Sequence, residues 1–218
     1  HNDDLEIISS FSNQAAVAIE NARLFDGLKS SNEELQIAYQ ATLKGWVRAL
    51  DLRDKETEGH TQRVTSLTLK LATAMGIQGD DLIHIERGAL LHDIGKMAIP
   101  DGILLKPAGL TPEERSLIEK HPVYAYEMLN PIKFLGPALD IPYCHHEKWN
   151  GTGYPRGLKA EQIPLAARIF AVADVWDALV SDRPYRKGLD PKEVKEKIKA
   201  DAGSHFDPRV VDVFLRLE

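Results

Sequence analysis

Apolar residues recur at steps of three and four along residues 5–43, which is the spacing of one face of an α-helix. The positions that form this stripe are Leu5, Ile8, Ala15, Ile19, Ala22, Leu24, Leu28, Leu35 and Ala38. The step from Ala22 to Leu24 breaks the stripe, and the second half has the character of a coiled coil. We predict one long amphipathic helix. A single helix is too thin to bury this stripe alone, so it needs a partner.

Two partners are compatible with this stripe. The same helix of a second chain would produce a homodimer, whereas packing on the rest of its own chain would leave a monomer. We expect the homodimer. Residues 1–44 are accordingly interpreted as a linker or signalling helix, and residues 45–218 as a separate domain.

Helical patterning continues after residue 45, for example over residues 64–75, 82–90 and 165–176. All twelve prolines lie in the last 119 residues, where they mark connections and helix starts. Thr111, Asp190 and Asp207 each stand directly before a proline, as a side chain that caps a helix N-terminus does. No alternating strand pattern is present. The predicted fold class is therefore all-α.

The composition of the chain argues against several classes of function. The chain has no run of about 18 apolar residues, so we expect no membrane insertion by this segment. The net charge of −6 argues against binding to duplex nucleic acid, which favours basic surfaces. The single cysteine, Cys144, excludes an internal disulfide and a multi-cysteine zinc site. A reducing, cytoplasmic setting is expected.

Histidines and carboxylates recur in positions that suit metal ligation. His92 and Asp93 follow an apolar run, and burying such a pair is costly unless a metal compensates it. Glu56 and His60 are four residues apart and share one helical face. The remaining candidates are His121, His145, His146 and Asp174. Each alone is more typical of a structural residue, so the argument depends on their joint order.

Two further features accompany these candidates. Adjacent positions on a helix point about 100° apart, so the pair His145 and His146 could serve two neighbouring metals. Asp177 lies one turn after Asp174. It is expected to orient a ligand or to join a local polar network.

Five stretches together resemble a known family: residues 56–64, 92–96, 121–122, 145–155 and 174–186. They are similar to the HD-GYP domains, cyclic di-GMP phosphodiesterases of the wider HD superfamily of metal-dependent phosphohydrolases. The resemblance runs from about residue 45 to the end of the chain. It implies an HD-type helical bundle preceded by the long helix.

The resemblance also implies a site with two or three divalent metal ions. The positions that match metal ligands are His60, His92, Asp93, His121, His145, His146 and Asp174. Asp93 corresponds to a carboxylate that bridges two metals, and Glu56 to an extra ligand of a third, although Glu58 lies nearby. Nitrogen and oxygen ligands without thiolate favour iron or manganese, as the family does, while zinc and nickel stay compatible.

For substrate contacts, Lys96 matches a catalytic, phosphate-contacting lysine, and Arg183 and Arg186 match cations that face phosphates. Tyr154, in the loop 153–155, would present its ring to a guanine or a phosphate. The alternative is a turn whose tyrosine packs on its own domain. The family also associates this loop with GGDEF-type partner domains, which synthesise the nucleotide.

The implied activity is hydrolysis of cyclic di-GMP to linear pGpG, and in a further step to GMP, by a hydroxide shared between metal ions. Two alternatives stay open. One is a receptor that binds the cyclic dinucleotide with little turnover. The other is an HD phosphohydrolase that acts on a different nucleotide, such as cyclic GMP-AMP.

Residues 12–25 resemble the last helix of a GAF-type sensor domain. In that family the helix commonly continues into a dimeric signalling helix. We therefore expect this sequence to be a piece of a longer sensor protein, in which His1 is not the natural start.

Overall fold

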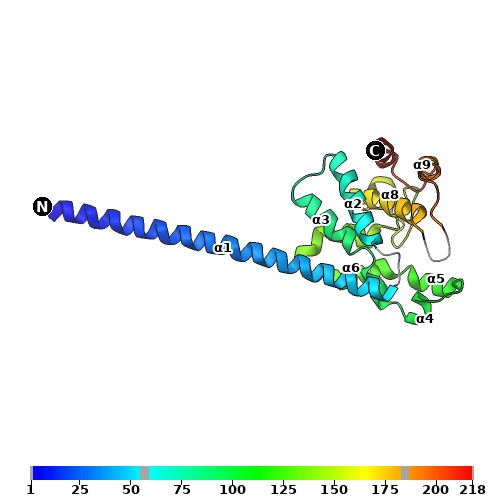
Figure 1. Ribbon diagram of the computed structural model, residues 1–218, viewed down its shortest axis with the longest axis horizontal. Helices are drawn as coiled ribbons and strands as arrows, with labels where there is room; N and C mark the ends of the chain where they lie inside the picture. Colours follow the sequence, from blue (N-terminus) through cyan, green and yellow to red (C-terminus); the bar gives the residue numbers. More distant parts are fainter. Residues whose placement is uncertain (1, 55–58, 183–186, 218) are drawn as a thin grey trace. The chain divides into compact units, whose positions relative to one another are not determined.

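The computed structural model describes residues 2–54, 59–182 and 187–217 (Figure 1). Within these ranges every regular element is a helix, and the β-type pairing is one isolated bridge between Ala202 and Phe206. The all-α prediction is confirmed. The chain divides into two compact units, His1–Lys44 and Gly45–Glu218.

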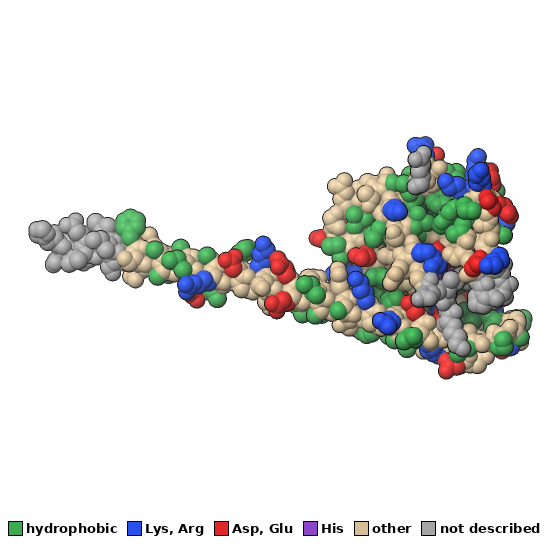
Figure 2. Space-filling model, viewed as in Figure 1, with side chains coloured by type: hydrophobic (Ala, Val, Ile, Leu, Met, Phe, Trp, Pro, Cys, Tyr) green, Lys and Arg blue, Asp and Glu red, His purple; other side chains and the backbone are tan. Residues whose placement is uncertain are grey.

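The first element, α1, is one uninterrupted helix over Asn2–Asp54 (Figure 1). The long helix predicted over residues 5–43 is thus confirmed, and it continues eleven residues further. Side chains from residue 11 to residue 38 are exposed, and Figure 2 shows apolar groups among them. The large exposed apolar residues of this stretch are Phe11, Val17, Ile19, Leu24, Phe25, Leu28, Leu35 and Ile37.

The second unit is a bundle of shorter helices. Its elements are α2 (His60–Ala74), α3 (Asp80–Leu90), η1 (Ile94–Ala98), α4 (Asp101–Leu104), α5 (Pro112–Ile118), α6 (His121–Leu129), η2 (Lys133–Leu139), α7 (Asp140–Cys144), η3 (Ala160–Gln162), α8 (Leu165–Val180), α9 (Pro191–Ala200) and α10 (Pro208–Arg216). Helix α8 is central and packs against α2, α7, α9 and α10. Its residues Ile169, Phe170 and Val172 are fully buried, so the core surrounds this helix.

The predicted helix starts are confirmed. Thr111 forms a capping box with Glu114, in which each side chain bonds the other residue's backbone N–H. Asp190 and Asp207 accept backbone N–H groups at the starts of α9 and α10. Residues 100–112, which we expected from Pro100 and Pro112 to form a connection, contain the short helix α4, so that expectation is wrong in part. This helix has four residues, too few for a periodic pattern.

One glycine fixes how η1 meets α6. A β-carbon on Gly95 would lie 1.9 Å from the carbonyl oxygen of His121, so only glycine allows this contact. The close approach brings the start of α6 against the turn that follows α3. Both segments carry candidate metal ligands.

Among the described residues, no helix combines the length and the apolar character that crossing a bilayer requires.

Candidate metal centre

The candidate ligands form two groups. We call His121, His145 and His146 the histidine group, and His60, His92 and Asp174 the mixed group. In each group, one ligand atom from every residue lies within 4.8 Å of the others. Six predicted ligands are thus brought together as two potential cation sites.

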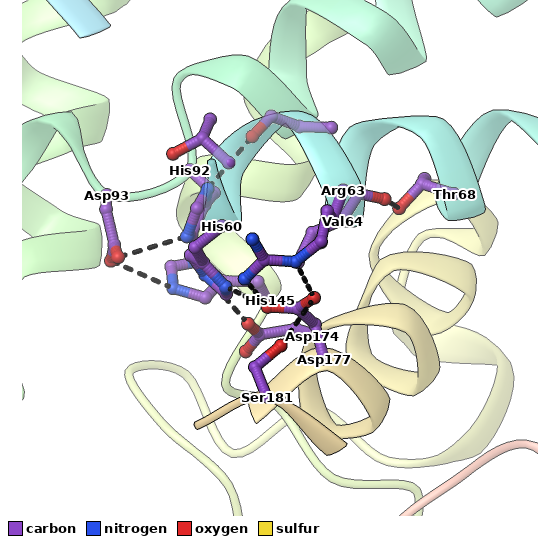
Figure 3. A network of polar contacts seen from close by, with 12 residues as sticks. His60, Arg63, Val64, Thr68, His92, Asp93, His145, Asp174, Asp177 and Ser181 are labelled. Atoms are coloured by element: carbon purple, nitrogen blue, oxygen red, sulfur yellow. Dashed lines mark hydrogen bonds and ion pairs between the residues drawn. The ribbon is translucent and has the colours of Figure 1, made fainter. Parts of the chain in front are cut away.

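Asp93 contacts both groups, and Figure 3 shows its carboxylate facing His92 and His145. Its Oδ2 is 3.0 Å from Nε2 of His92, in the mixed group. Its Oδ1 is 3.3 Å from Nε2 of His121 and 3.9 Å from Nε2 of His145, in the histidine group. One carboxylate therefore reaches both groups, as a bridging ligand must.

Helix ends position most of these side chains. His60 and His121 are the first residues of α2 and α6, and His92 and Asp93 lie in the turn after α3. Asp174 projects from the middle of α8. The chain changes direction at these helix ends. Side chains from α2, α6, α8 and the turn after α3 can therefore meet at one point.

His145 and His146 differ from expectation. Helix α7 ends at Cys144, so the pair lies beyond the helix rather than inside it. The two rings lie 4.0 Å apart between centroids, and both belong to the histidine group. The 100° separation expected of neighbours on a helix does not apply to them.

Backbone carbonyls orient three of the histidine rings. Nδ1 of His92, His121 and His145 lies 2.9, 2.8 and 3.1 Å from the carbonyl oxygens of Ala89, Ile118 and Ile141. A carbonyl can only accept, so each Nδ1 carries the hydrogen and each Nε2 presents a lone pair. Metal-ligating histidines have this arrangement.

The fit to a cation follows from one short distance. Nε2 of His121 and Nε2 of His145 lie 3.1 Å apart, both buried. Two lone pairs facing each other repel, and a divalent cation bound by both nitrogens removes the repulsion. Nitrogen and carboxylate donors of this kind suit first-row transition metals.

Electrostatics keeps the histidine group neutral. Burial, reinforced by the neighbouring histidines, holds the pKa of His145 well below its ordinary value. Burial likewise lowers the pKa of His146 to about 3 and lowers the pKa of His121. These imidazoles are therefore unprotonated near neutral pH, which is the form that binds a metal.

Asp93 is held in the ionised form. Burial raises the pKa of its carboxyl, but the interactions with His92 and with the charged Lys96 outweigh this and bring the pKa well below the usual range. Nζ of Lys96 is 2.9 Å from Oδ2 of Asp93 and 2.8 Å from Oδ2 of Asp54. Lys96, expected as a phosphate contact, thus lies between two carboxylates.

A second polar network holds His60 (Figure 3). Its Nδ1 is 2.7 Å from Oδ2 of Asp177, and its Nε2 is 3.5 Å from Oδ1 of Asp174. Arg63 donates two hydrogen bonds to the Asp177 carboxylate, of 2.6 and 2.9 Å, and Ser181 donates a third. Asp177 therefore joins a polar network that orients a candidate ligand, as expected.

Tyr154 adjoins the histidine group. Its ring centroid is 4.7 Å from that of His146, and its backbone N–H donates to the His146 carbonyl. A β-carbon on Gly153 would lie 2.4 Å from the backbone nitrogen of Lys148, so the loop needs glycine there. The buried carboxylate of Glu147 accepts the backbone N–H groups of Arg156 and Leu158 and fixes the loop.

Three predicted residues, Glu56, Arg183 and Arg186, lie outside the described residues. Three others, Asp54, Arg63 and Glu147, were given no role from the sequence. Arg63 carried a usable signal, since it lies three positions after His60 and shares its helical face. Asp54 had no such signal, because its partner Lys96 is 42 residues away.

Comparisons with known proteins identify the family of this chain. A family model described as an HD domain matches residues 46–210. A cyclic di-GMP phosphodiesterase of Thermotoga maritima is 41% identical over 199 residues, which cover 88% of this chain and 54% of that protein. The 3'3'-cGAMP-specific phosphodiesterase 2 of Vibrio cholerae is 35% identical over 214 residues, which cover 97% of this chain and 40% of that protein.

A solved structure shares the fold. The cyclic GMP-AMP specific phosphodiesterase V-cGAP3 of Vibrio cholerae matches with a TM-score of 0.62 at 21% identity, over 80% of this chain and 47% of that one. This chain spans about half the length of the first curated relatives it matches. The family model covers most of the bundle that carries both ligand groups. The chain belongs to the HD domain family.

Proposed function

We propose that residues 45–218 form a metal-dependent phosphodiesterase that hydrolyses cyclic di-GMP to linear pGpG and, in a further step, to GMP. The observation that carries the proposal is Asp93, a buried carboxylate within reach of nitrogen ligands from both groups. Divalent ions bound there would polarise the phosphoryl oxygen and lower the pKa of a water molecule. The relatives named above support the reaction class.

The residues would divide the metal ligation between them. The mixed group would hold one ion and the histidine group another, with Asp93 shared. Glu56 would complete a third site. The absence of thiolate among the donors favours iron or manganese.

Substrate phosphates would be met by cations beside these ligands. Lys96 is the described candidate, because its ammonium lies 2.9 Å from Asp93 and can form charge-assisted bonds with a phosphate. Tyr154 would contact a base, and this proposal is supported by the position of its ring against His146. Burial raises the pKa of Tyr154, so its phenol stays neutral and can donate a hydrogen bond. Arg183 and Arg186 would complete the phosphate contacts.

A second candidate substrate is cyclic GMP-AMP. The observation that favours it is the relative from Vibrio cholerae that is named as specific for 3'3'-cGAMP and matches 97% of this chain. Both substrates offer two phosphodiesters, so the metal ligands do not distinguish them. The discrimination would fall to residues that contact the second base.

The test is a hydrolysis assay on protein loaded anaerobically with Fe²⁺ or Mn²⁺. Cyclic di-GMP and 3'3'-cGAMP are supplied separately, and chromatography resolves pGpG, GMP and AMP. Metal-free protein and the Asp93→Ala variant are the controls. Faster turnover of 3'3'-cGAMP would favour the second candidate, and binding without turnover would favour a receptor.

We further propose that α1 pairs with α1 of a second copy. Its exposed residues Leu24, Leu28 and Leu35 are spaced four and seven apart and fit a two-stranded coiled coil. Light scattering on the chain and on the double variant Leu28→Glu with Leu35→Glu tests this. We expect a dimer and a monomer, respectively, with Lys29→Glu as a control that stays dimeric.

A second partner interaction is expected at the loop 153–155. The family resemblance implies GGDEF-type domains as partners of that loop, and this stays a prediction. An upstream sensor domain before α1 is likewise a prediction.

A further inference from the structure

The last two residues of α1 contact the segment that carries Lys96. Arg53 donates hydrogen bonds to the carbonyl oxygens of Lys96, Met97 and Ile99, with lengths of 3.1, 3.0 and 2.6 Å. Its Nε donates a fourth bond, of 2.9 Å, to the carboxylate of Asp101. One guanidinium therefore satisfies the carbonyls at the end of η1 and ties α1 to η1 and α4.

The next residue makes a different contact. Asp54 accepts from Nζ of Lys96 at 2.8 Å, while the same ammonium lies 2.9 Å from Asp93. The three side chains are nearly buried, with exposures of 9% for Asp54, 13% for Lys96 and 12% for Asp93. Charge pairs at such depth are strongly sensitive to the loss of one member.

We infer that Arg53 and Asp54 are positioning residues of the metal centre. Arg53 fixes the backbone of η1, and Asp54 shares the Lys96 ammonium with Asp93. This keeps Asp93 available to the cations of both groups. The inference rests on the proposed metal centre. It means that the end of α1 is connected to the shared carboxylate, Asp93, through Lys96.

The covalent structure of α1 couples the movements of Arg53 and Asp54. Arg53 and Asp54 are consecutive residues of one helix, so a turn of the helix end about its axis moves both together. Such a turn would strain the Arg53 bonds and shift Lys96 relative to Asp93. The metal centre would thus respond to the orientation of α1 at its C-terminal end.

Asp54→Asn keeps the size of the side chain and removes its charge. Lys96 then loses the pairing with Asp54, pairs more closely with Asp93 and competes with cations for it. We expect the affinity for Mn²⁺ to fall about tenfold, the lower end of the effect seen for partners of metal ligands. Arg53→Gln, which loses the bonds to η1, should weaken Mn²⁺ binding and lower kcat more than it changes KM.

The experiment measures Mn²⁺ binding by calorimetric titration of the metal-free full chain, using the metal alone. Matched controls are Arg48→Gln, an exposed arginine of α1, and Asp212→Asn, whose carboxylate pairs with Arg216 on α10. Both controls should bind Mn²⁺ as the wild type does. Circular dichroism and thermal unfolding show whether each variant keeps the helical fold.

A double-mutant cycle separates positioning from general structural damage. If Asp54 acts through Lys96, then Asp54→Asn should lose most of its effect on Mn²⁺ affinity in a Lys96→Met background. An unchanged effect in that background, or wild-type Mn²⁺ affinity in both Asp54→Asn and Arg53→Gln, overturns the inference.

These readouts also separate the inference from the proposed activity. Weakened Mn²⁺ binding in a chain that hydrolyses neither nucleotide would sustain the inference and reject the proposed function. Normal hydrolysis, together with unchanged Mn²⁺ affinity in the variants, would sustain the proposed function and reject the inference. A wild-type chain that binds no Mn²⁺ overturns both.

Discussion

The two ligand groups are built from similar side chains but are oriented by different means. In the histidine group, His121 and His145 are fixed by the backbone carbonyl oxygens of Ile118 and Ile141. In the mixed group, His60 is fixed by the side chain of Asp177, which Arg63 holds in turn. Backbone carbonyls cannot be removed by substitution, whereas side chains can. The two histidine-group rings are therefore held by the backbone, whereas in the mixed group a backbone carbonyl holds His92 but replaceable side chains hold His60.

The groups also differ in charge. The mixed group contains its own carboxylate, Asp174, while the histidine group consists of three neutral imidazoles. A divalent cation in the histidine group would depend on Asp93 to compensate its charge. Loss of Asp93 should thus affect both groups and the histidine group most.

Asp93→Ala should have the largest effect. It removes the carboxylate that reaches both groups, so the activity should fall by about 100-fold or more, beyond the loss typical of partners of metal ligands. The helical fold should survive, because Asp93 lies in a turn outside the hydrophobic core cluster. Elemental analysis of metal per chain, with circular dichroism, checks this. Wild-type metal content and turnover would remove Asp93 from the site.

His145→Ala should empty the histidine group and spare the mixed group. The ring is buried and its Nε2 faces that of His121, so its loss removes a donor that the fold cannot replace. We expect the variant to lose the ion held by the histidine group and to retain the other. Spectroscopic detection of coupling between two Mn²⁺ ions measures this. Persistent coupling would show that the ions are not divided as proposed.

Asp177→Asn should weaken the mixed group alone. The amide keeps the shape but loses the charge that orients His60 and binds Arg63, and about a tenfold loss of metal affinity is typical of such a change. Calorimetric titration with Mn²⁺ should show one weakened and one unchanged binding event. Asp212→Asn, in an exposed ion pair, is the matched control. Equal weakening of both events would contradict the comparison between the groups.

Much of the fold follows from local sequence signals. The spacing of apolar residues predicts α1 and α8, and Thr111 before Pro112 predicts the start of α5. Segment η1 was missed, because five residues in a 3₁₀ turn carry no periodic pattern. Its conformation depends on the contact of Gly95 with α6, which joins residues distant in the chain.

In the candidate site, the metal ligands are predictable from the sequence, but the groups that orient them are not. Ligands such as His60 and Asp174 stand out by residue type and order, because few other roles need that combination. The groups that orient them do not stand out. Every residue has a carbonyl, so nothing in the sequence marks Ile118 or Ile141, and the pairing of Asp54 with Lys96 exists only after folding.

The smallest expected effect concerns acid stability. Burial raises the pKa of Asp177, but hydrogen bonds from His60 and Arg63 outweigh it and lower the pKa to about 2. A pKa lowered by folding means that the ionised carboxylate stabilises the native state fully above its unfolded pKa of about 4. This stabilisation disappears as the pH falls through about 2.

The measurement compares thermal unfolding of the metal-free wild type with metal-free Asp177→Asn at a series of pH values. The wild type should unfold at the higher temperature near neutral pH, and the difference should shrink as the pH falls from about 4 to about 2. The carbonyls that orient the histidine group do not titrate, so this acid sensitivity belongs to the network around His60. A difference that stays constant with pH would mean that Asp177 stabilises His60 by its shape, and the two groups would then be oriented by equally uncharged contacts.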